Sequence, residues 1–335
     1  MTRKICGVRK VKFPFRIEGI DIIITAHYRI HINSIDLNGT TRRCCGGIGF
    51  AVQRPALRLR VEESSIDEVI SSHNADAEKY LALVKAVERY KGYLRVEEIE
   101  AVRPHIGLGS LTQLKLSILK AIRLFKGQSL DEASIPRELR IGTTSGIGLG
   151  TFLYGGFILE GGYRVGASAQ KAINGEEGGL PAPILARYEL PQDWGVLLAV
   201  PKSLQSISGS QEEEFFDSIT PTPQNETREI AYHILLGVLP AIREADFDGF
   251  VESVKLVCRL GSKPYELRLN PACLPVIGAL ESLFGFGGLS SLGPTCYTFF
   301  ERTRYDNIMV RNLELRFPDF DWIVTEFRNG PHSVS

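Results

Sequence analysis

A glycine-rich loop between a strand and a helix constrains the fold more than any other feature of the sequence. The loop is Gly107-Leu108-Gly109-Ser110. Residues 96–106 before it are predicted as a strand, and residues 111–125 after it carry apolar side chains at helical spacing. Glycines let the backbone wrap closely around a ligand, and the start of a helix offers free N–H groups that suit phosphate. The pattern favours a phosphate-binding loop, to which the hydroxyls of Ser110 and Thr112 would add donors for phosphate or Mg²⁺.

The loop by itself leaves a plainer alternative open, a strand-to-helix turn in which Ser110 caps the helix. It is not a Walker A loop, because no Gly-Lys-Ser/Thr follows the glycines. It is not a dinucleotide-binding GxGxxG loop either, because position 112 is a threonine. The phosphate-binding interpretation therefore needs support from the rest of the chain.

The remaining pattern predicts an α+β protein. Helices run together late in the chain instead of alternating with strands, which argues against a doubly wound sheet. Glycines and prolines, which interrupt helices and strands, are frequent in residues 178–183 and suggest a domain boundary nearby. We expect two domains, 1–185 and 186–335. Besides the strand and helix around the loop, the predicted strands are 21–32, 50–61, 194–200, 295–300 and 322–327, and the predicted helices are 67–90, 225–245, 246–260, 271–284 and 304–316.

Length and composition set the class of protein. The chain has 335 residues, of which 44% are apolar, and a formal net charge of zero. It is therefore globular, and it has no overall charge that would attract nucleic acid or an acidic membrane. No stretch approaches the roughly 18 apolar residues of a membrane-spanning helix. The N-terminus lacks the apolar core of a signal peptide. We expect a cytoplasmic protein without nucleic-acid or membrane partners.

The six cysteines show no zinc-ligand spacing. Free thiols in a reducing compartment are the expected state. Cys44 and Cys45 are adjacent, and redox activity is the alternative for that pair.

Four segments, in the right order, resemble one branch of the GHMP superfamily of small-molecule kinases, β-ribofuranosylaminobenzene 5'-phosphate synthase. The similarity extends from about residue 22 to residue 330, and residues 182–188 and 328–329 also fit. The segments are residues 29–39, residues 105–113 (HIGLGSLTQ), residues 144–148 with 154–157, and residues 291–295 (SLGPT).

The resemblance implies both a fold and a reaction. The fold would have two domains, a ribosomal-protein-S5-like N-terminal domain and a ferredoxin-like C-terminal domain. Such synthases condense phosphoribosyl pyrophosphate with 4-aminobenzoate or 4-hydroxybenzoate and release CO₂ and pyrophosphate, in methanopterin biosynthesis. They use Mg²⁺ without ATP. A homodimer is also implied, and the glycine-rich loop would hold the pyrophosphate.

The resemblance also implies roles for individual residues. Catalytic roles, or recognition of carboxylate and phosphate, fall to Arg29, His31 and Asp36. Other substrate contacts fall to Asn38, Arg187, Gly293, Pro294 and Thr295, and a magnesium contact falls to Ser110. The phosphate and pyrophosphate would be bound by His105, Gly107, Leu108, Gly109, Ser110, Thr112, Gln113, Thr144, Ser145 and Gly146.

Several of these residues have plainer explanations. Asp36 precedes Leu37-Asn38-Gly39 and could cap its own turn. His31 could be a satisfied histidine on a half-buried strand. Residues 144–146 could form a simple strand-to-helix turn, and residues 293–295 could simply bend the chain.

Two positions depart from the family pattern. Cys45 stands where the synthases typically carry an acidic residue. Ile141 stands where they carry an arginine, and Arg140, one position earlier, could substitute for it. The alternatives are an ATP-dependent GHMP kinase and a non-catalytic ligand-binding paralogue. The kinase is disfavoured, because no acidic residue follows Ser145-Gly146 closely.

Overall fold

The larger of two β-sheets is built mainly from the first half of the chain. The computed structural model describes residues 21–142, 145–165, 180–204, 207 and 210–335. Strand order in the larger sheet is β12-β1-β2-β4-β3, with β5 and β6 paired to β2 and β7 paired to β5. Its strands are β1 (Asp21–Asp36), β2 (Arg43–Ser64), β3 (Glu68–Ile70), β4 (Tyr93–Glu100), β5 (Phe157–Glu160), β6 (Tyr163–Arg164), β7 (Ile184–Tyr188) and β12 (Ser333–Val334).

The smaller sheet has the order β11-β8-β10-β9. Its strands are β8 (Trp194–Pro201), β9 (Gly288–Leu289), β10 (Cys296–Glu301) and β11 (Phe320–Glu326). Every residue of β8 is buried, because both faces of this sheet are covered. Val196 and Leu198 face the main core, whereas Leu197 and Ala199 belong to a second apolar cluster, as the period of two in a strand requires.

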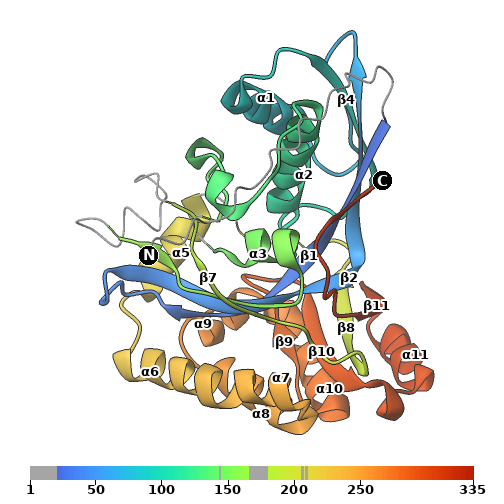
Figure 1. Ribbon diagram of the computed structural model, residues 1–335. Helices are drawn as coiled ribbons and strands as arrows, with labels where there is room; N and C mark the ends of the chain where they lie inside the picture. The colour runs from blue at the N-terminus through green and yellow to red at the C-terminus, as the bar shows by residue number, and fades with distance from the viewer. Residues whose placement is uncertain (1–20, 143–144, 166–179, 205–206, 208–209) are drawn as a thin grey trace, which may run out of the picture.

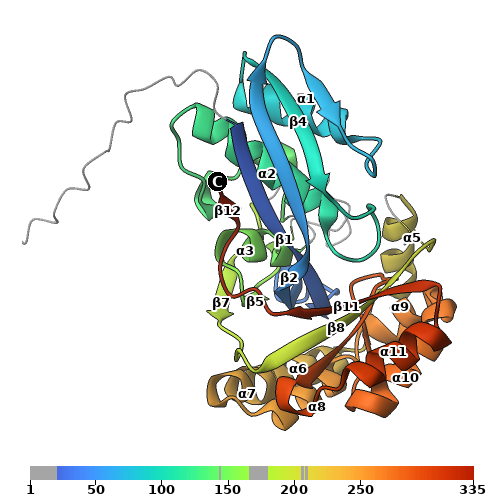
Figure 2. The ribbon, with the colours of Figure 1, turned by 90° about the vertical axis from the view of Figure 1, so that its right-hand side faces the viewer.

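Helices form layers against both sheets. Figures 1 and 2 show α1, α2 and α3 on one side of the larger sheet and α6 to α11 gathered around the smaller one. The helices are α1 (Ala77–Glu88), α2 (Ser110–Phe125), α3 (Ile147–Tyr154), α5 (Ser210–Ile219), α6 (Gln224–His233), α7 (Leu239–Glu244), α8 (Phe247–Val257), α9 (Lys263–Leu269), α10 (Leu274–Phe284) and α11 (Asn307–Arg316). None of the described helices is long and apolar enough to cross a membrane.

An aromatic cluster joins the two sheets. Phe50 of β2 lies 4.9 Å from Phe327, 5.6 Å from Phe299 and 6.1 Å from Tyr297, measured between ring centroids. The chain also returns to the larger sheet at its end, where Val334 pairs with Ile24. The two halves of the chain therefore share one core, and the boundary at residue 185 stays a prediction.

Most predicted elements are present, and the α+β class is confirmed. The strands at 21–32 and 50–61 extend further than expected, and the helix over 225–245 is observed as α6, a π-helical turn at Ile234–Val238, and α7. The helix predicted over 67–90 is wrong at its start. Residues Glu68–Ile70 form β3 instead, where Val69 pairs with Val96 in parallel, and the helix begins only at Ala77. Elements α5, α9 and β7 were not predicted.

Candidate active site

The backbone at the two glycines of the loop is packed too closely to accept a side chain. Gly107 has a φ of +86°, and a Cβ there would lie 2.5 Å from the carbonyl oxygen of Ser290. Gly109 has a φ of +71° and is the N-cap of α2, so the alternative in which Ser110 caps the helix is wrong. Leu108 between the glycines is buried and anchors the loop in the core. The loop therefore presents backbone, not side chains, at the start of α2.

Arg29 of β1 lies directly beneath this loop. Its Nη1 donates a hydrogen bond to the carbonyl oxygen of Gly107, and its backbone N–H donates to the carbonyl oxygen of Leu108 over 3.2 Å. Burial lowers the pKa of Arg29 to about 10, which still leaves the guanidinium charged at neutral pH. A positive charge is thus fixed against the loop.

The first turns of α2 and α3 meet at the same place. The side-chain amide of Gln113 donates to the carbonyl oxygen of Gly148 over 2.9 Å, and a Cβ on Gly148 would lie 3.1 Å from Thr112 Cγ2. Ser145 Oγ accepts a hydrogen bond from the N–H of Ile147 over 3.3 Å. Helix N-termini carry partial positive charge and free N–H groups. Two of them side by side make an anion-binding wall.

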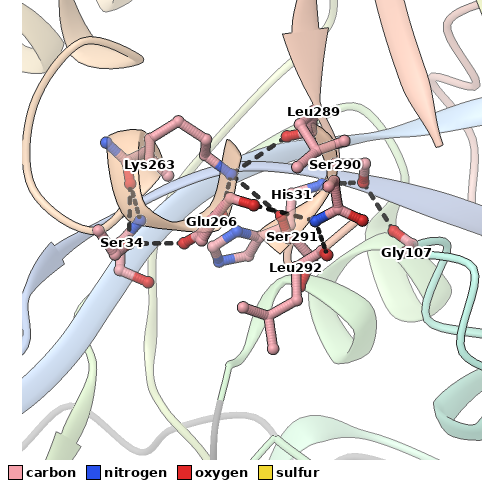
Figure 3. Close-up of polar contacts among 12 residues, drawn as sticks. His31, Ser34, Gly107, Lys263, Glu266, Leu289, Ser290, Ser291 and Leu292 are labelled. Atoms are coloured by element: carbon pink, nitrogen blue, oxygen red, sulfur yellow. Dashed lines mark hydrogen bonds and ion pairs between the residues drawn. The ribbon is translucent and has the colours of Figure 1, made fainter. Parts of the chain in front are cut away.

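The segment around Ser290 braces this loop from the second half of the chain. Figure 3 shows Ser290 between His31 and Gly107: its Oγ accepts from the His31 N–H over 3.1 Å and donates to the Gly107 carbonyl oxygen over 2.7 Å. The N–H of Ser291 donates to the carbonyl oxygen of His31 over 3.0 Å. Thr295 Oγ1 donates to the carbonyl oxygen of Ile106 over 2.6 Å.

A buried ion pair lies next to the segment 290–295, which is called the brace below because it holds the glycine-rich loop. Lys263 and Glu266 of α9 are 1% and 3% exposed and form a salt bridge. Lys263 Nζ also donates to the carbonyl oxygens of Leu289 over 3.1 Å and Ser291 over 3.3 Å, as Figure 3 shows. The pair therefore fixes the backbone that holds the loop.

His31 is neutral in this setting. It is 6% exposed, and burial, with Arg29 and Lys263 nearby, holds its pKa well below its ordinary value. Its Nδ1 has no hydrogen-bond partner among the described residues. A buried polar atom without a partner is costly to the folded state.

These groups enclose a cavity of about 210 Å³. Residues near the helix starts, with Arg29 and Arg140, provide a cationic wall, and Leu37, Cys45 and Phe216 provide an apolar one. Burial raises the pKa of Glu212 on the same cavity, and the charge of Arg29 opposes that rise. The lining is Arg29, His31, Ser34, Leu37, Cys45, Thr112, Arg140, Gly142, Ser145, Gly148, Glu212, Phe216, Glu266 and Ser291.

Four of the predicted site residues line the cavity, and the other described ones lie elsewhere. Arg29, His31, Thr112 and Ser145 line the cavity. The loop residues Gly107–Ser110, Gln113 and Gly146 are not among the described lining residues, although Ser110 is the first residue of α2 and Gly146 is the N-cap of α3, next to lining residues Thr112 and Ser145. Gly293, Pro294 and Thr295 belong to the brace behind the loop. Thr144 lies outside the described residues.

Asp36 and Asn38 are engaged in holding a turn. Asp36 Oδ1 accepts from the N–H of Asn38 over 2.8 Å, and its Oδ2 accepts from Thr40 Oγ1 over 3.3 Å, as the plainer alternative expects. Asn38 in turn exchanges hydrogen bonds with the backbone of Thr222.

Arg187 and His105 lie apart from the cavity lining. Arg187 binds the carbonyl oxygens of Gly155 and Asn329, which ties β7 to the C-terminal segment. His105 is exposed, with a φ of +60°. Neither residue is among the described residues that line the cavity.

The sequence analysis did not predict three residues that line the cavity, two of which are acidic. Glu212 and Phe216 come from α5, and Glu266 comes from α9, two helices that were not predicted. The two positions that depart from the family pattern lie in different surroundings. Cys45 lines the cavity, whereas Ile141 is 3% exposed in the core. Arg140 lines the cavity, in keeping with the expectation that it substitutes for the arginine of the family pattern.

Comparison with known proteins identifies relatives along nearly the whole chain. A β-ribofuranosylphenol 5'-phosphate synthase from Archaeoglobus fulgidus is 33% identical over 315 residues, which cover 90% of this chain and 95% of that protein. The protein of the same name from Methanocaldococcus jannaschii is 33% identical over 335 residues, covering 93% and 100%. No family model matches the chain.

Solved structures share the fold at low identity. A homoserine kinase from Cytophaga hutchinsonii superposes with a TM-score of 0.62 at 14% identity, covering 97% of this chain and all of that one. A mevalonate pyrophosphate decarboxylase from Streptococcus pyogenes gives 0.64 at 13% identity, covering 94% and 99%. These are GHMP-type folds, as expected. The chain therefore belongs to the β-ribofuranosylphenol 5'-phosphate synthase family, and its fold is of the GHMP-kinase type.

Proposed function

We propose that the chain is a pentosyltransferase that condenses phosphoribosyl pyrophosphate with an aromatic acid and releases CO₂ and pyrophosphate, in methanopterin biosynthesis. The observation that carries the proposal is a single cavity with a cationic wall at two helix starts and an apolar wall opposite. The relatives are named for a phenol product, which favours 4-hydroxybenzoate over 4-aminobenzoate as the acceptor.

The cationic wall suits the pyrophosphate. Breaking the bond between the ribose C1 and the leaving oxygen moves an electron pair onto the pyrophosphate. The N–H groups at the starts of α2 and α3 and the charges of Arg29 and Arg140 stabilise that growing negative charge. Because Arg29 is held by Gly107, it needs no rearrangement when the charge develops.

The apolar wall suits the aromatic ring. Leu37, Cys45 and Phe216 belong to one small apolar cluster, so this part of the wall is continuous. The ring carbon that bears the carboxylate attacks the ribose C1, and the bond to the carboxylate then breaks and returns its electrons to the ring. No proton moves at that carbon, so His31 need not act as a base. The neutral His31 side chain lines the cavity and would contact the substrate there.

Magnesium fits this cavity only with help from the substrate. The described residues contain no group of three or more His, Cys, Asp or Glu side chains arranged to hold a metal. Mg²⁺ in proteins is commonly held by one or two carboxylates together with substrate phosphates. Glu212 would be that carboxylate, with the Ser110 hydroxyl at the start of α2. The ion would supply charge neutralisation to the pyrophosphate.

The test measures CO₂ released from carboxyl-labelled 4-hydroxybenzoate, and separately from 4-aminobenzoate, with phosphoribosyl pyrophosphate and Mg²⁺. We expect release that depends on phosphoribosyl pyrophosphate and not on ATP. Arg140→Ala should raise KM for phosphoribosyl pyrophosphate roughly tenfold, which corresponds to one charged hydrogen bond. Arg137→Ala is the matched control, since Arg137 is an exposed arginine three residues away and is absent from the described lining. A folded protein that releases no CO₂ from either acid would refute the proposal.

A further inference from the structure

Two adjacent cysteines point to the same side of their strand. Successive side chains of a strand normally point to opposite faces. Cys44 and Cys45 lie together in β2, yet their Sγ atoms are only 3.5 Å apart. The cause is the backbone of Cys45, which has a φ of +66°. A residue with a side chain loses roughly 1–2 kcal/mol in this conformation. Pairing on both sides holds it there, with Asp36 opposite Cys45 and Tyr163 opposite Cys44.

One of the two thiols lies at the cavity wall. Cys45 is 8% exposed and lines the cavity, whereas Cys44 is 1% exposed, is absent from the described lining and contacts Cys45 through its sulfur. The Tyr163 hydroxyl is 3.3 Å from Cys45 Sγ, and Cys44 Sγ donates weakly to the carbonyl oxygen of Leu37 over 3.5 Å. A ligand that contacts Cys45 at the cavity wall therefore has the buried Cys44 sulfur and the Tyr163 phenol oxygen next to it, within one small apolar cluster.

The spacing of the sulfurs fits a chelate better than a disulfide. Metal–sulfur bonds of about 2.3 Å at a tetrahedral centre separate two sulfurs by about 3.8 Å, close to the observed 3.5 Å. A disulfide would need about 2.05 Å between the sulfurs. It would also join Cα atoms that are about 3.8 Å apart, which is below the usual range. Soft thiolate ligands favour thiophilic metals over Mg²⁺.

We propose that Cys44 and Cys45 form a two-sulfur binding site for a soft, thiophilic divalent cation that enters through the cavity. Binding breaks both S–H bonds, forms two metal–sulfur bonds and releases two protons to solvent. The Tyr163 hydroxyl is the third donor within reach, and the side facing the cavity stays open to water. The ligands of this site differ from the Glu212 carboxylate proposed for magnesium, although Cys45 and Glu212 line the same cavity, and the existence of the site does not depend on the proposed reaction.

The experiment titrates the full-length, reduced protein with Cd²⁺ in the absence of substrates. We expect one Cd²⁺ per chain bound tightly, with thiolate-to-cadmium ultraviolet absorption and release of two protons. Cys44→Ser and Cys45→Ser should each abolish the absorption of this site. The matched control is Cys273→Ser, because Cys273 and Cys296 form a second buried thiol pair around the carbonyl oxygen of Pro294. This variant should bind Cd²⁺ like the wild type.

Other outcomes would overturn the proposal. No cadmium–thiolate absorption in the wild type would do so, as would absorption that survives both Cys44→Ser and Cys45→Ser but disappears in Cys273→Ser. An intact mass lighter by two hydrogens before reduction, mapped to the peptide containing Cys44 and Cys45, would show that the pair exists as a disulfide instead. Circular dichroism establishes that each variant is folded, and the two single variants provide independent tests of the same site.

Discussion

Arg29 hydrogen-bonds through Nη1 to the carbonyl oxygen of Gly107, so one side chain both lines the cavity and supports the glycine-rich loop. Replacing it with lysine keeps the charge but loses the planar guanidinium that donates to Gly107 and lines the cavity. We expect Arg29→Lys to lower kcat/KM for phosphoribosyl pyrophosphate by about 10²–10³, the usual effect of losing one preorganised donor.

Steady-state kinetics with saturating aromatic acid would measure the effect of Arg29→Lys. Arg58→Lys is the control, because the Arg58 side chain is 41% exposed and, within the part of the chain that the structure describes, its salt bridge is with Glu100 at the surface. An unchanged kcat/KM in Arg29→Lys would mean that the pyrophosphate binds elsewhere.

Two glycines with similar backbones should respond differently to alanine. Gly107 and Gly127 both have positive φ, +86° and +65°, but a Cβ at Gly127 meets nothing within 4 Å. Gly127→Ala should cost about 1 kcal/mol of unfolding free energy, from the backbone alone. Gly107→Ala should cost about 2–4 kcal/mol, because its Cβ also collides with Ser290. Urea denaturation measures both, and equal losses would contradict the tight packing of the loop.

Removing one partner of the buried Lys263–Glu266 salt bridge should destabilise the fold more than neutralising both partners. Lys263→Met leaves Glu266 charged and unpaired, and should lower the free energy of unfolding by about 3–5 kcal/mol. Adding Glu266→Gln removes that charge and keeps an acceptor for the Ser262 hydroxyl. The double variant should therefore regain part of the loss in chemical denaturation. A double variant less stable than Lys263→Met would contradict this account.

Glu160 should make stability depend on pH. It is fully buried, and burial raises its pKa from 4.5 to about 7, with only a partial offset from the Gly162 N–H. Between these values the folded protein keeps a proton that the unfolded chain releases. The free energy of unfolding should therefore fall as pH rises from 4.5 to 7, by about 3 kcal/mol at most, and level off above that.

Thermal or urea unfolding across this pH range would measure the effect of Glu160. Glu160→Gln cannot ionise and should show a smaller decline than the wild type. Parallel curves for the two proteins would show that Glu160 is already ionised at low pH in the folded state.

The sequence predicted an element correctly where the pattern that defines it lies within the element and its flanking residues. The helix at Ser110–Phe125 was predicted to within one residue of its observed bounds, because its apolar stripe and the preceding glycines are all local. Residues Glu68–Ile70 were assigned to a helix, because their strand state depends on Arg95–Glu97, which lie far along the chain. Helix α5 was missed because its described residues include no buried side chain to mark a core face.

The sequence alone determined the glycine loop, the α+β class and the family resemblance, since these depend on residue types in fixed order. Only the tertiary structure decided which residues share a cavity. Arg29 and His31 meet Glu212 and Ser291 because strand β1, helix α5 and the brace before β10 converge there. It likewise brought the sulfurs of Cys44 and Cys45 together. The cavity depends on packing between segments distant in sequence, and the thiol contact depends on a backbone φ of +66° at Cys45 that the strand pairing holds, so no local pattern encodes either.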